Sequence, residues 1–475
     1  MRRRAVVVIT IMLITIAARA GAFDIPYESW MGSYVADKKI GYMSYKIDDA
    51  VFEGAKGYRI ASVLNNRLTI LGADLTQLVT TVVYTDTNYA PLREDFSVSS
   101  GGKTTTIRAT FNKDTIDCVV SAGSGVSKQS VPIPKGISLV GDAMFVMPNE
   151  KLNVGDQHTL HYFNPLTLAI EDLLVKVERR EKITVGGKDY DTVVLTNTTG
   201  MGDMTIWQDE TGDCIQLEAV MGIRMVKESE SEATSGLETA ASEDFAVLTS
   251  VKPDKEIADP RDLKNLDIIF TGLEKQMAIN DSRQKTTSID EPSQKVRFNV
   301  KALNFDLEKS ITLPVDDKEF ADDLASTAYL DWDTSSIRQQ ARDIVGAENN
   351  AYRACAKIRD WIYSNMTVDK TIGITRSASD VLKSKRGVCR DYGILFATLA
   401  RAAGIPSRIV AGLLYIDNAF YYHVWTECYV GKWIPFDATL PTDFVDATHI
   451  KLAEGDAPTM FGLAKVIGSL KAEIK

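Results

Sequence analysis

The sequence is poor in the residues that hold structural metals. Only five cysteines and four histidines occur among 475 residues. The cysteines are far apart, and no two have the C-x-x-C spacing that is typical of zinc sites. His158 and His161 are three residues apart in a predicted strand, so they lie on opposite faces and make a poor metal pair. We therefore expect neither a bound metal nor an organic cofactor.

A basic tract is also missing. The chain has 64 acidic and 54 basic side chains, a formal net charge of −10. Such a surface repels phosphate backbones, so we expect no nucleic-acid partner. The apolar fraction of 45% and the charged fraction of 25% are typical of a water-soluble globular protein, long enough here for two or three domains.

Only one segment has the apolar character of a membrane-directed sequence. It reads "MRRRAVVVITIMLITIAARAGAFD", with three arginines, an apolar run and then Ala18, Ala20 and Ala22. This pattern predicts a secretory signal over residues 1–22, because the run is shorter than the roughly 20 residues of a membrane span. We expect an exported protein, periplasmic or secreted, with no stable membrane insertion beyond that segment; an uncleaved anchor is the alternative. Cleavage would leave 50 basic and 64 acidic side chains, a net charge of −14.

Composition divides the remaining chain into three parts. Residues 23–227 show short alternating runs broken by turn residues, as around Gly186 and Gly187, which predict a β-rich antiparallel domain. Residues 228–260 are acidic, rich in small residues and without periodicity, which indicates a linker. Residues 261–475, with a core over 335–450, begin with strand patterns and continue with helical ones. The predicted fold class is α+β, with helices packed on an antiparallel sheet in the C-terminal part.

Three helices are predicted in the C-terminal part. The first precedes Gly346, and the second carries one apolar stripe, which places Cys355 in the core. The third begins beside Cys389 and ends before Gly404 and Pro406. The stripe of the second helix consists of Ala351, Cys355, Ile358 and Ile362.

Cys389 has two interpretations. A thiol at a helix N-terminus faces the positive end of the macrodipole, which favours the reactive thiolate, and Arg386 and Arg390 add positive charge. Cysteine is also among the most buried residue types, so Cys389 could equally be a small core residue. Its own surroundings do not decide between them.

Two predicted strands downstream carry a histidine and an aspartate. His423 shares a strand face with Trp425, whereas Cys428 is on the other face. Asp437 closes the second strand, and it shares the face of His423 only if the connecting loop has three residues, Val430–Lys432, or a bulge occurs near Pro435. Thiol catalysis needs a nucleophile, a base and a group that orients the base, and these three residues could supply those roles.

At this point the chain resembles the transglutaminase-like branch of the papain-like cysteine enzymes. The matching stretches are "SASDVLKSKRGVCRDYGILFATLARAAGIPSRIVAGLLY", "YYHVWTECYVGKWIPFDAT" and "VDATHIKL". In that family the cysteine of G-x-C is the nucleophile, the histidine of H-x-W the base and the aspartate of W-x-x-x-D the orienting group. The resemblance therefore implies catalytic roles for Cys389, His423 and Asp437. Two positions depart from the common pattern, Val424 and the "FDATL" that follows the second strand.

The resemblance extends less specifically to the rest of the chain and to the oxyanion donor. With "WMGSYVADKKIGY" near its start, the chain is similar to larger exported bacterial proteins that carry a β-rich domain ahead of this one. The backbone amide of Cys389 is the natural first oxyanion donor. Related enzymes add an indole upstream of the cysteine, which makes Trp361 a candidate, although packing in its helix explains this residue equally well.

Two functions from different classes remain. The first is thiol-dependent acyl transfer on a peptide or protein amide, of the peptidase, amidase or transglutaminase type. The second is a non-catalytic exported binding or scaffold protein that keeps the fold. Amine acetyl transfer would use similar residues but lacks a recognisable cofactor site.

The other four cysteines leave the disulfide pattern open. Two fall in each predicted domain, so Cys118 could pair with Cys214 and Cys355 with Cys428. Burial on a helix stripe and on a strand face explains the last two equally well.

Overall fold

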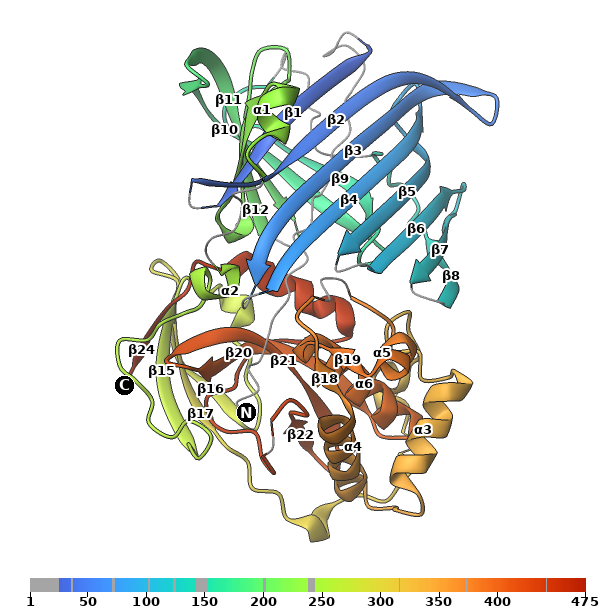
Figure 1. Cartoon of the computed structure of the whole chain (residues 1–475), viewed down its shortest axis with the longest axis vertical. Helices are drawn as coiled ribbons and strands as arrows, with labels where there is room; N and C mark the ends of the chain where they lie inside the picture. The colour runs from blue at the N-terminus through green and yellow to red at the C-terminus, as the bar shows by residue number, and fades with distance from the viewer. Residues whose placement is uncertain are drawn as a thin grey trace. The chain divides into compact units, whose positions relative to one another are not determined.

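The computed structural model describes residues 25–475 except 36, 71–72, 101–102, 123–124, 142–151, 200–201, 238–243, 316, 372–374 and 441. The predicted signal segment, residues 1–22, lies outside the described residues. The chain forms two compact units, the first ending at Asp244 and the second running from Phe245 to Lys475. Both are drawn in Figure 1. No described helix combines the length and the apolar character needed to cross a bilayer.

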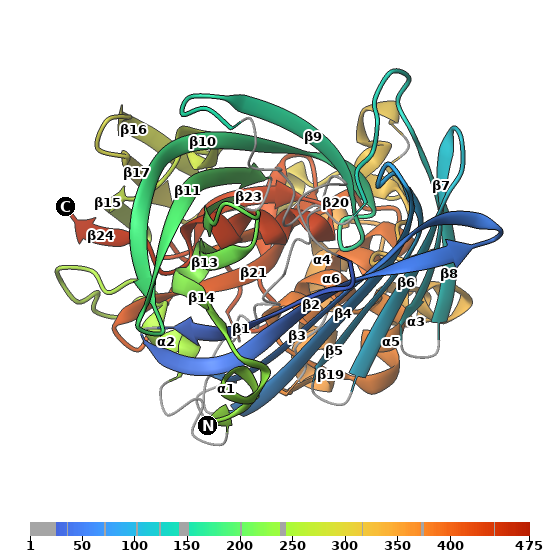
Figure 2. The ribbon, with the colours of Figure 1, turned by 90° about the horizontal axis from the view of Figure 1, so that it is seen from above.

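The N-terminal unit is built on one antiparallel sheet of 14 strands, which curves strongly (Figure 2). Its order is β8-β7-β6-β5-β4-β3-β2-β1-β14-β13-β12-β11-β10-β9, so nearly every strand pairs with its neighbour in sequence. The strands are β1 (Tyr27–Val35), β2 (Lys38–Phe52), β3 (Ala55–Ile70), β4 (Ala73–Asp86), β5 (Pro91–Ser100), β6 (Lys103–Phe111), β7 (Thr115–Ala122), β8 (Gly125–Pro132), β9 (Gln157–Asn164), β10 (Ala169–Val185), β11 (Lys188–Thr199), β12 (Gly202–Gln208), β13 (Cys214–Ala219) and β14 (Ile223–Glu228).

The local sequence explains these hairpins. Side chains along β5 alternate between buried and more exposed, as the period-2 pattern requires. Gly186 and Gly187 have φ of 58° and 76° and form the two-residue turn between β10 and β11, where glycine meets no steric penalty. The predicted β-rich character of this region is confirmed.

The range predicted as a linker contains ordered structure. Helix α1 (Glu230–Thr234) begins at Ser229, whose side chain accepts from the Glu232 amide while the Glu232 carboxylate accepts from the Ser229 amide. This S-x-x-E capping box is readable in the sequence, but the acidic composition concealed it. Helix α2 (Phe245–Leu248) follows, and Val251 pairs with Phe420 within the C-terminal unit.

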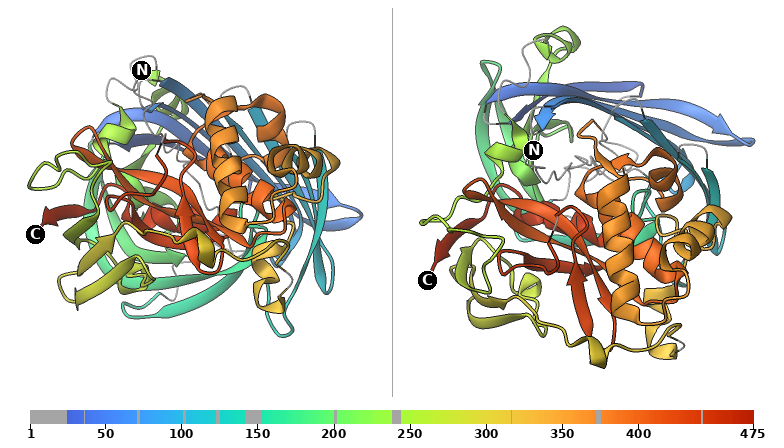
Figure 3. Two further views of the ribbon diagram at one scale, coloured as in Figure 1. Left: turned by 90° about the horizontal axis from the view of Figure 1, so that it is seen from below. Right: turned by 60° about the horizontal axis from the view of Figure 1, so that its bottom comes forward.

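The C-terminal unit combines two four-stranded antiparallel sheets with helices, so the predicted α+β class is confirmed. The sheet orders are β16-β17-β15-β24 and β22-β21-β20-β23, and β18 and β19 form a short parallel pair. Figure 3 shows the orange helices beside the red strands of the second sheet. The elements are β15 (Asn265–Thr271), β16 (Gln284–Asp290), β17 (Lys295–Lys301), α3 (Ser335–Val345), α4 (Ala351–Asn365), β18 (Thr367–Val368), α5 (Ala378–Ser384), β19 (Arg386–Gly387), α6 (Cys389–Ala402), β20 (Ser407–Ile416), β21 (Ala419–Tyr429), β22 (Trp433–Phe436), β23 (Ile450–Gly455) and β24 (Lys471–Ile474).

Helix α6 is the central helix of this unit. It is buried along nearly its whole length and packs on β21, where the Thr426 hydroxyl donates to the Gly393 carbonyl oxygen at 3.1 Å. A Cβ at Gly393 would lie 3.1 Å from a methyl carbon of Val424, so the close approach favours glycine. All three predicted helices are confirmed, with Gly346 and Gly404 following α3 and α6 at positive φ.

The loop between β21 and β22 sets the register of the site. Tyr429 pairs with Trp433, so the loop has the three residues Val430–Lys432, one of the two predicted solutions. Phe436 pairs with Thr426, which places the next residue, Asp437, on the strand face of His423.

Candidate active site

Cys389 is the first residue of α6, and its side chain is 2% exposed. Asp391 holds the preceding turn, because its Oδ2 accepts from the Val388 amide at 2.9 Å and its Oδ1 lies 3.1 Å from Arg376 Nη2. Gly387 leaves room for this carboxylate, since a Cβ there would lie 2.5 Å from the Asp391 Cβ. The G-x-C motif therefore places the thiol at the positive end of the helix macrodipole.

The two arginines beside the cysteine differ in their surroundings. Arg390 is buried and interacts electrostatically with Cys389 and Asp391; burial, the largest influence, lowers the pKa of its guanidinium. Arg386 is exposed and pairs with Asp369 at 3.1 Å. Arg390 is therefore the better placed of the two to add positive charge near the thiol.

His423 lies on β21, is 0% exposed, and has its Nε2 2.8 Å from Asp437 Oδ2. Burial alone would lower the pKa of His423, but the Asp437 carboxylate and the Cys389 side chain outweigh burial and raise it to about 9. Nδ1 makes no hydrogen bond of standard geometry with any described residue, so it is the ring nitrogen left for the thiol. The structure thus brings Cys389, His423 and Asp437 together.

Asp437 follows β22 directly, and both of its carboxylate oxygens take part in hydrogen bonds. Its Oδ1 accepts from the Thr439 amide at 2.8 Å and from the Thr439 hydroxyl at 2.6 Å, while Oδ2 faces His423. Burial opposes ionisation, but His423 and His449 outweigh it and hold the pKa of Asp437 well below its usual value. The "FDATL" stretch, which departs from the family pattern, supplies this anchoring threonine.

His449 is a site residue that sequence reasoning missed. Its Nε2 lies 3.2 Å from Asp437 Oδ2, so one carboxylate oxygen faces two histidines. Its Nδ1 lies 3.4 Å from Asp446 Oδ1, and both His449 and Asp446 are buried. The stretch "VDATHIKL" was part of the family resemblance, but nothing in its spacing related His449 to Asp437.

The indole of Trp425 packs against both imidazoles. Its ring stacks on His423 at 6.2 Å between centroids and meets His449 edge to face at 5.3 Å. Trp425 is 1% exposed, so it excludes water from the cluster. A low dielectric strengthens the charge interactions of His423 and Asp437.

Two imidazoles and a carboxylate are also a donor set that zinc accepts. The donor atoms of His423, Asp437 and His449 all lie within 4.8 Å of one another. Their nitrogen–oxygen separations of 2.8 and 3.2 Å are, however, those of direct hydrogen bonds. We therefore interpret the group as a hydrogen-bonded cluster.

Trp361, the candidate oxyanion donor, lies half-buried in α4. The Lys385 ammonium is 5.3 Å from the centroid of its ring. This cation–π contact explains part of its packing. The oxyanion role stays a prediction.

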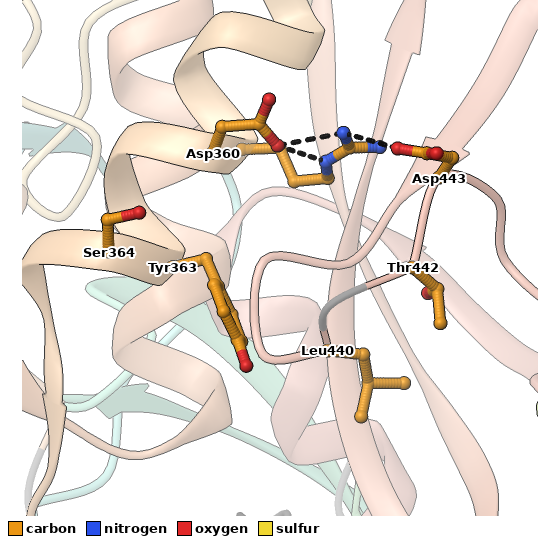
Figure 4. A pocket seen from close by; sticks show the side chains of 7 residues that line it. Asp360, Tyr363, Ser364, Leu440, Thr442 and Asp443 are labelled. Atoms are coloured by element: carbon orange, nitrogen blue, oxygen red, sulfur yellow. Dashed lines mark hydrogen bonds and ion pairs between the residues drawn. The ribbon is translucent and has the colours of Figure 1, made fainter.

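A cavity of about 230 Å³ lies between α4 and the loop after Asp437 (Figure 4). The Arg359 guanidinium donates to Asp360 at 2.8 Å and to Asp443 at 2.9 Å. The two carboxylates lie on opposite sides of this guanidinium. Because two carboxylates already neutralise the guanidinium, the cavity is a poor site for an anion. Its lining consists of Arg359, Asp360, Tyr363, Ser364, Leu440, Thr442 and Asp443.

All five cysteines are buried, and the structure joins no two of them in a disulfide. Burial and the neighbouring Cys355 thiol raise the pKa of Cys428, so these two side chains are in contact. Cys118 and Cys214 lie on β7 and β13, which seven strands separate in the sheet order, and each donates to a backbone carbonyl oxygen. Of the two pairings left open by the sequence, only Cys355 with Cys428 therefore has its thiols side by side.

Comparisons with known proteins match different parts of the chain to two families. Residues 31–227 match a family described as a protein of unknown function (DUF3108). An uncharacterized protein of Mycobacterium leprae is 27% identical over 145 residues, which are 29% of this chain and 50% of that protein. An uncharacterized protein of Haemophilus influenzae is 30% identical over 115 residues, 23% of this chain and 30% of that protein. The chain thus spans half or less of the length of these relatives.

A solved structure from Cytophaga hutchinsonii, provisionally named a cysteine protease, has 22% identity and a TM-score of 0.33 over 45% of this chain and 83% of that one. The model of the transglutaminase-like superfamily matches residues 338–438 and includes Cys389, His423 and Asp437. His449 lies beyond the end of that match. Residues 338–438 of this chain thus match the transglutaminase-like superfamily, downstream of a β-rich region that matches the family of unknown function.

Proposed function

We propose that this protein is a thiol acyltransferase that acts on amide bonds, with Cys389 as nucleophile, His423 as base and acid, and Asp437 as the orienting group. The observation that carries the proposal is the contact of His423 with both partners: its Nε2 lies 2.8 Å from Asp437 and its ring interacts with Cys389. The raised pKa of His423, about 9, means that the imidazolium persists at neutral pH, as a thiolate–imidazolium pair requires.

The reaction follows from these roles. In the proposed reaction the Cys389 thiolate adds to the carbonyl carbon of a peptide or protein amide, and the backbone amide of Cys389 is the proposed donor to the resulting oxyanion. The C–N bond then breaks, and the leaving nitrogen takes a proton from the His423 imidazolium. Neutral His423 next removes a proton from the incoming nucleophile, which attacks the thioester and releases the thiolate. Water as the nucleophile gives a peptidase or amidase, and an amine gives a transglutaminase.

A screen of the purified protein against peptide and glutamine-amide pools tests the proposal. Wild type should release ammonia or an amine, or incorporate a labelled amine, while Cys389→Ala should do neither. Cys118→Ala is the matched control, because it removes a buried thiol from the other unit. Equal turnover by wild type and Cys389→Ala would rule out Cys389 as the nucleophile.

A non-catalytic scaffold is the second candidate, and the burial of the site favours it. Cys389, His423 and Asp437 are only 2%, 0% and 3% exposed, so a substrate needs local opening to reach the thiol. Iodoacetamide labelling at mildly acidic pH separates the two functions. An enzyme should be alkylated quickly and only at Cys389, because its thiolate persists at that pH; a scaffold should react no faster than an ordinary thiol.

Export is part of the proposal and draws on the N-terminal sequence alone. Expression with residues 1–22 intact, fractionation of the cells and N-terminal sequencing of the product test it. We expect a product that begins after Ala20 or Ala22 in an extracytoplasmic fraction. Retention of residues 1–22 in a membrane fraction would support the anchor instead.

A further inference from the structure

A second histidine shares the carboxylate that orients His423. The Nε2 of His449 lies 3.2 Å from Asp437 Oδ2, the same oxygen that lies 2.8 Å from His423 Nε2. The pKa of Asp437 is held well below its usual value, so this carboxylate is ionised and can only accept hydrogen bonds. The Nε2 of each histidine is therefore the donor, whatever the state of its Nδ1.

These bonds fill the hydrogen-bonding positions of Asp437. An ionised carboxylate accepts at about four lone-pair positions. Oδ1 accepts from the amide and the hydroxyl of Thr439 at 2.8 and 2.6 Å, and Oδ2 accepts from His423 and His449. A rotation of the carboxylate that loosened its bond to His423 would also break its bond to His449. His449 therefore opposes that rotation.

Aromatic packing fixes the ring of His449. The ring meets the Trp425 indole edge to face at 5.3 Å between centroids, and it meets the His423 imidazole at 5.9 Å. The side chain of His449 is 0% exposed, so bulk water does not compete for its Nε2–H. Turning the ring away from Asp437 would leave a buried donor unsatisfied, which is costly. The ring is therefore held with Nε2 toward Asp437.

Two arginines that are distant in the sequence hold the backbone of His449. The His449 amide donates to the Asp446 carbonyl oxygen at 3.3 Å and closes a turn. Arg283 is buried, and its guanidinium donates to the backbone carbonyl oxygens of both these residues. The Asp446 carboxylate accepts from the Thr448 amide at 2.8 Å and lies 2.8 Å from Arg261 Nη1. The turn that presents His449 is thus fixed at both ends.

This support continues into β23, the strand that follows His449. The Gln284 side chain pairs with the backbone of Lys451 through two hydrogen bonds of 2.8 and 2.9 Å. Both partners lie outside residues 338–438, the range that matches the superfamily model, and so do His449 and the two arginines. Residues outside the matched range therefore hold a carboxylate that lies within it.

We propose that His449 is a positioning residue: it donates through Nε2 to Asp437 Oδ2 and holds this carboxylate in the orientation that His423 needs. The inference rests on the proposed function of Cys389, His423 and Asp437. A neutral or a charged His449 ring serves equally, because one Nε2–H is sufficient.

The test compares His449→Gln with His449→Phe. The side-chain amide of glutamine can place an N–H near the position of the imidazole Nε2, whereas phenylalanine keeps the ring shape and has no donor. The readout is the rate, at pH 7.5, of Cys389 carboxymethylation by iodoacetate, an anionic reagent that the His423 imidazolium attracts. In wild type this rate falls where His423 loses its proton, near pH 9.

We expect His449→Phe to slow carboxymethylation by about tenfold, the factor expected for the loss of a hydrogen bond to a charged group. His449→Gln should react about as fast as wild type. A packing role predicts the reverse order, because phenylalanine fills the space of the ring better than glutamine does. A wild-type rate for His449→Phe, or a rate for His449→Gln as low as that of His449→Phe, would overturn the proposal. His158→Phe is the matched control, because it removes a half-buried histidine from the other unit.

A double-mutant cycle tests whether His449 acts through Asp437. Urea unfolding is measured for wild type, His449→Phe, Asp437→Ala and the double variant. Once the carboxylate is gone, the Nε2–H of His449 has lost its acceptor, so the phenylalanine substitution should cost less stability than it does in wild type. Equal costs in the two backgrounds would mean that His449 does not act through Asp437 and would refute the proposal.

Nitrogen NMR of histidine-labelled wild type gives an independent measurement if a variant fails to fold. A proton on Nε2 of His449 supports the proposal, and a ring protonated on Nδ1 alone refutes it. The spectrum of His449→Gln assigns the signal among the four histidines. If wild-type Cys389 reacted no faster than an ordinary thiol, the proposed function would fail and the positioning role with it. The cycle and the NMR spectrum would then still show whether His449 donates to Asp437, so the two failures are distinguishable.

Discussion

Replacement of Asp437 by asparagine tests the central contact of the site. Asparagine keeps the size and one hydrogen-bonding oxygen but removes the carboxylate charge, which contributes most to raising the pKa of His423 from 6.5 to about 9 against burial. That difference, 9 minus 6.5, corresponds to about 3 kcal/mol of interaction between the imidazolium and its surroundings. Because the pair is fully buried, solvent does not screen it. We therefore expect the pKa of His423 to fall toward 6.5 in Asp437→Asn, since the Cys389 side chain alone then opposes burial.

The loss of imidazolium at neutral pH follows from the same values. At pH 7.5 a group of pKa 9 is about 97% protonated and one of pKa 6.5 about 9%, so the population of the His423 imidazolium should fall about tenfold. Carboxymethylation of Cys389 by iodoacetate, followed by mass spectrometry over pH 5–10, measures this. The fall in rate should move from near pH 9 toward pH 6.5.

A second histidine–aspartate pair provides the control. His161 and Asp172 in the N-terminal unit are also 2.8 Å apart, but their side chains are 29% and 72% exposed. Asp172→Asn should leave the carboxymethylation profile unchanged and cost little stability, as is usual for exposed pairs. If Asp437→Asn had the profile of wild type, the orienting role of Asp437 would be wrong.

The remaining predictions concern stability, the nucleophile, the turn before it, the thiols and metals. Because the pKa of His423 is raised in the folded state, His423 should contribute about 3 kcal/mol to the free energy of unfolding below pH 6.5, and this contribution should be lost as the pH rises through about 9. Urea unfolding should therefore show a larger difference in free energy of unfolding between wild type and Asp437→Asn at pH 6 than at pH 10. Cys389→Ala should abolish turnover yet keep the wild-type circular dichroism and melting temperature. If the variant were unfolded, its loss of turnover would not be evidence that Cys389 is the nucleophile. Gly387→Ala should slow alkylation of Cys389 and lower stability by on the order of 1–3 kcal/mol, because the new methyl group meets the Asp391 side chain; unchanged values would show that the turn adapts. Non-reducing peptide mapping of active protein should find no bridge to Cys389, whose pairing would contradict the catalytic assignment. Dialysis against a chelator should leave activity unchanged, and loss restored by zinc would reassign the histidine cluster as a metal site.

Much of the geometry of the candidate site could be predicted from the sequence because it is local. The G-x-C motif, the helix pattern after it and the stop at Gly404 predict where the thiol lies, and the structure has α6 over that range. Strand alternation predicts the face of His423, and the loop Val430–Lys432 has the length that places Asp437 on the same face. Each of these inferences depends only on dihedral preferences and side-chain period within a short segment.

Composition says little about a short segment that carries a local motif. The acidic segment after residue 227, a predicted linker, includes Ser229 and Glu232, which form a capping box and start α1. A few capping hydrogen bonds are sufficient to order one turn of helix next to a sheet, and composition averages conceal them. Export, the oxyanion role of Trp361 and the disulfide pattern stay predictions.

The sequence by itself determined the residue types, the helix start at Cys389 and the strand faces of His423 and Asp437, because neighbours along the chain fix these features. Only the tertiary structure decided that His449 shares the Asp437 carboxylate, that Arg261 pairs with Asp446 and that Arg283 donates to the backbone carbonyl oxygen of His449. Arg283 and His449 are separated by 166 positions, and no period or motif connects them. The physical reason is that a buried charge must find partners wherever the fold brings them, so the pairing of β16 with β17 and of β23 with β20, rather than any short pattern, sets the network around His449.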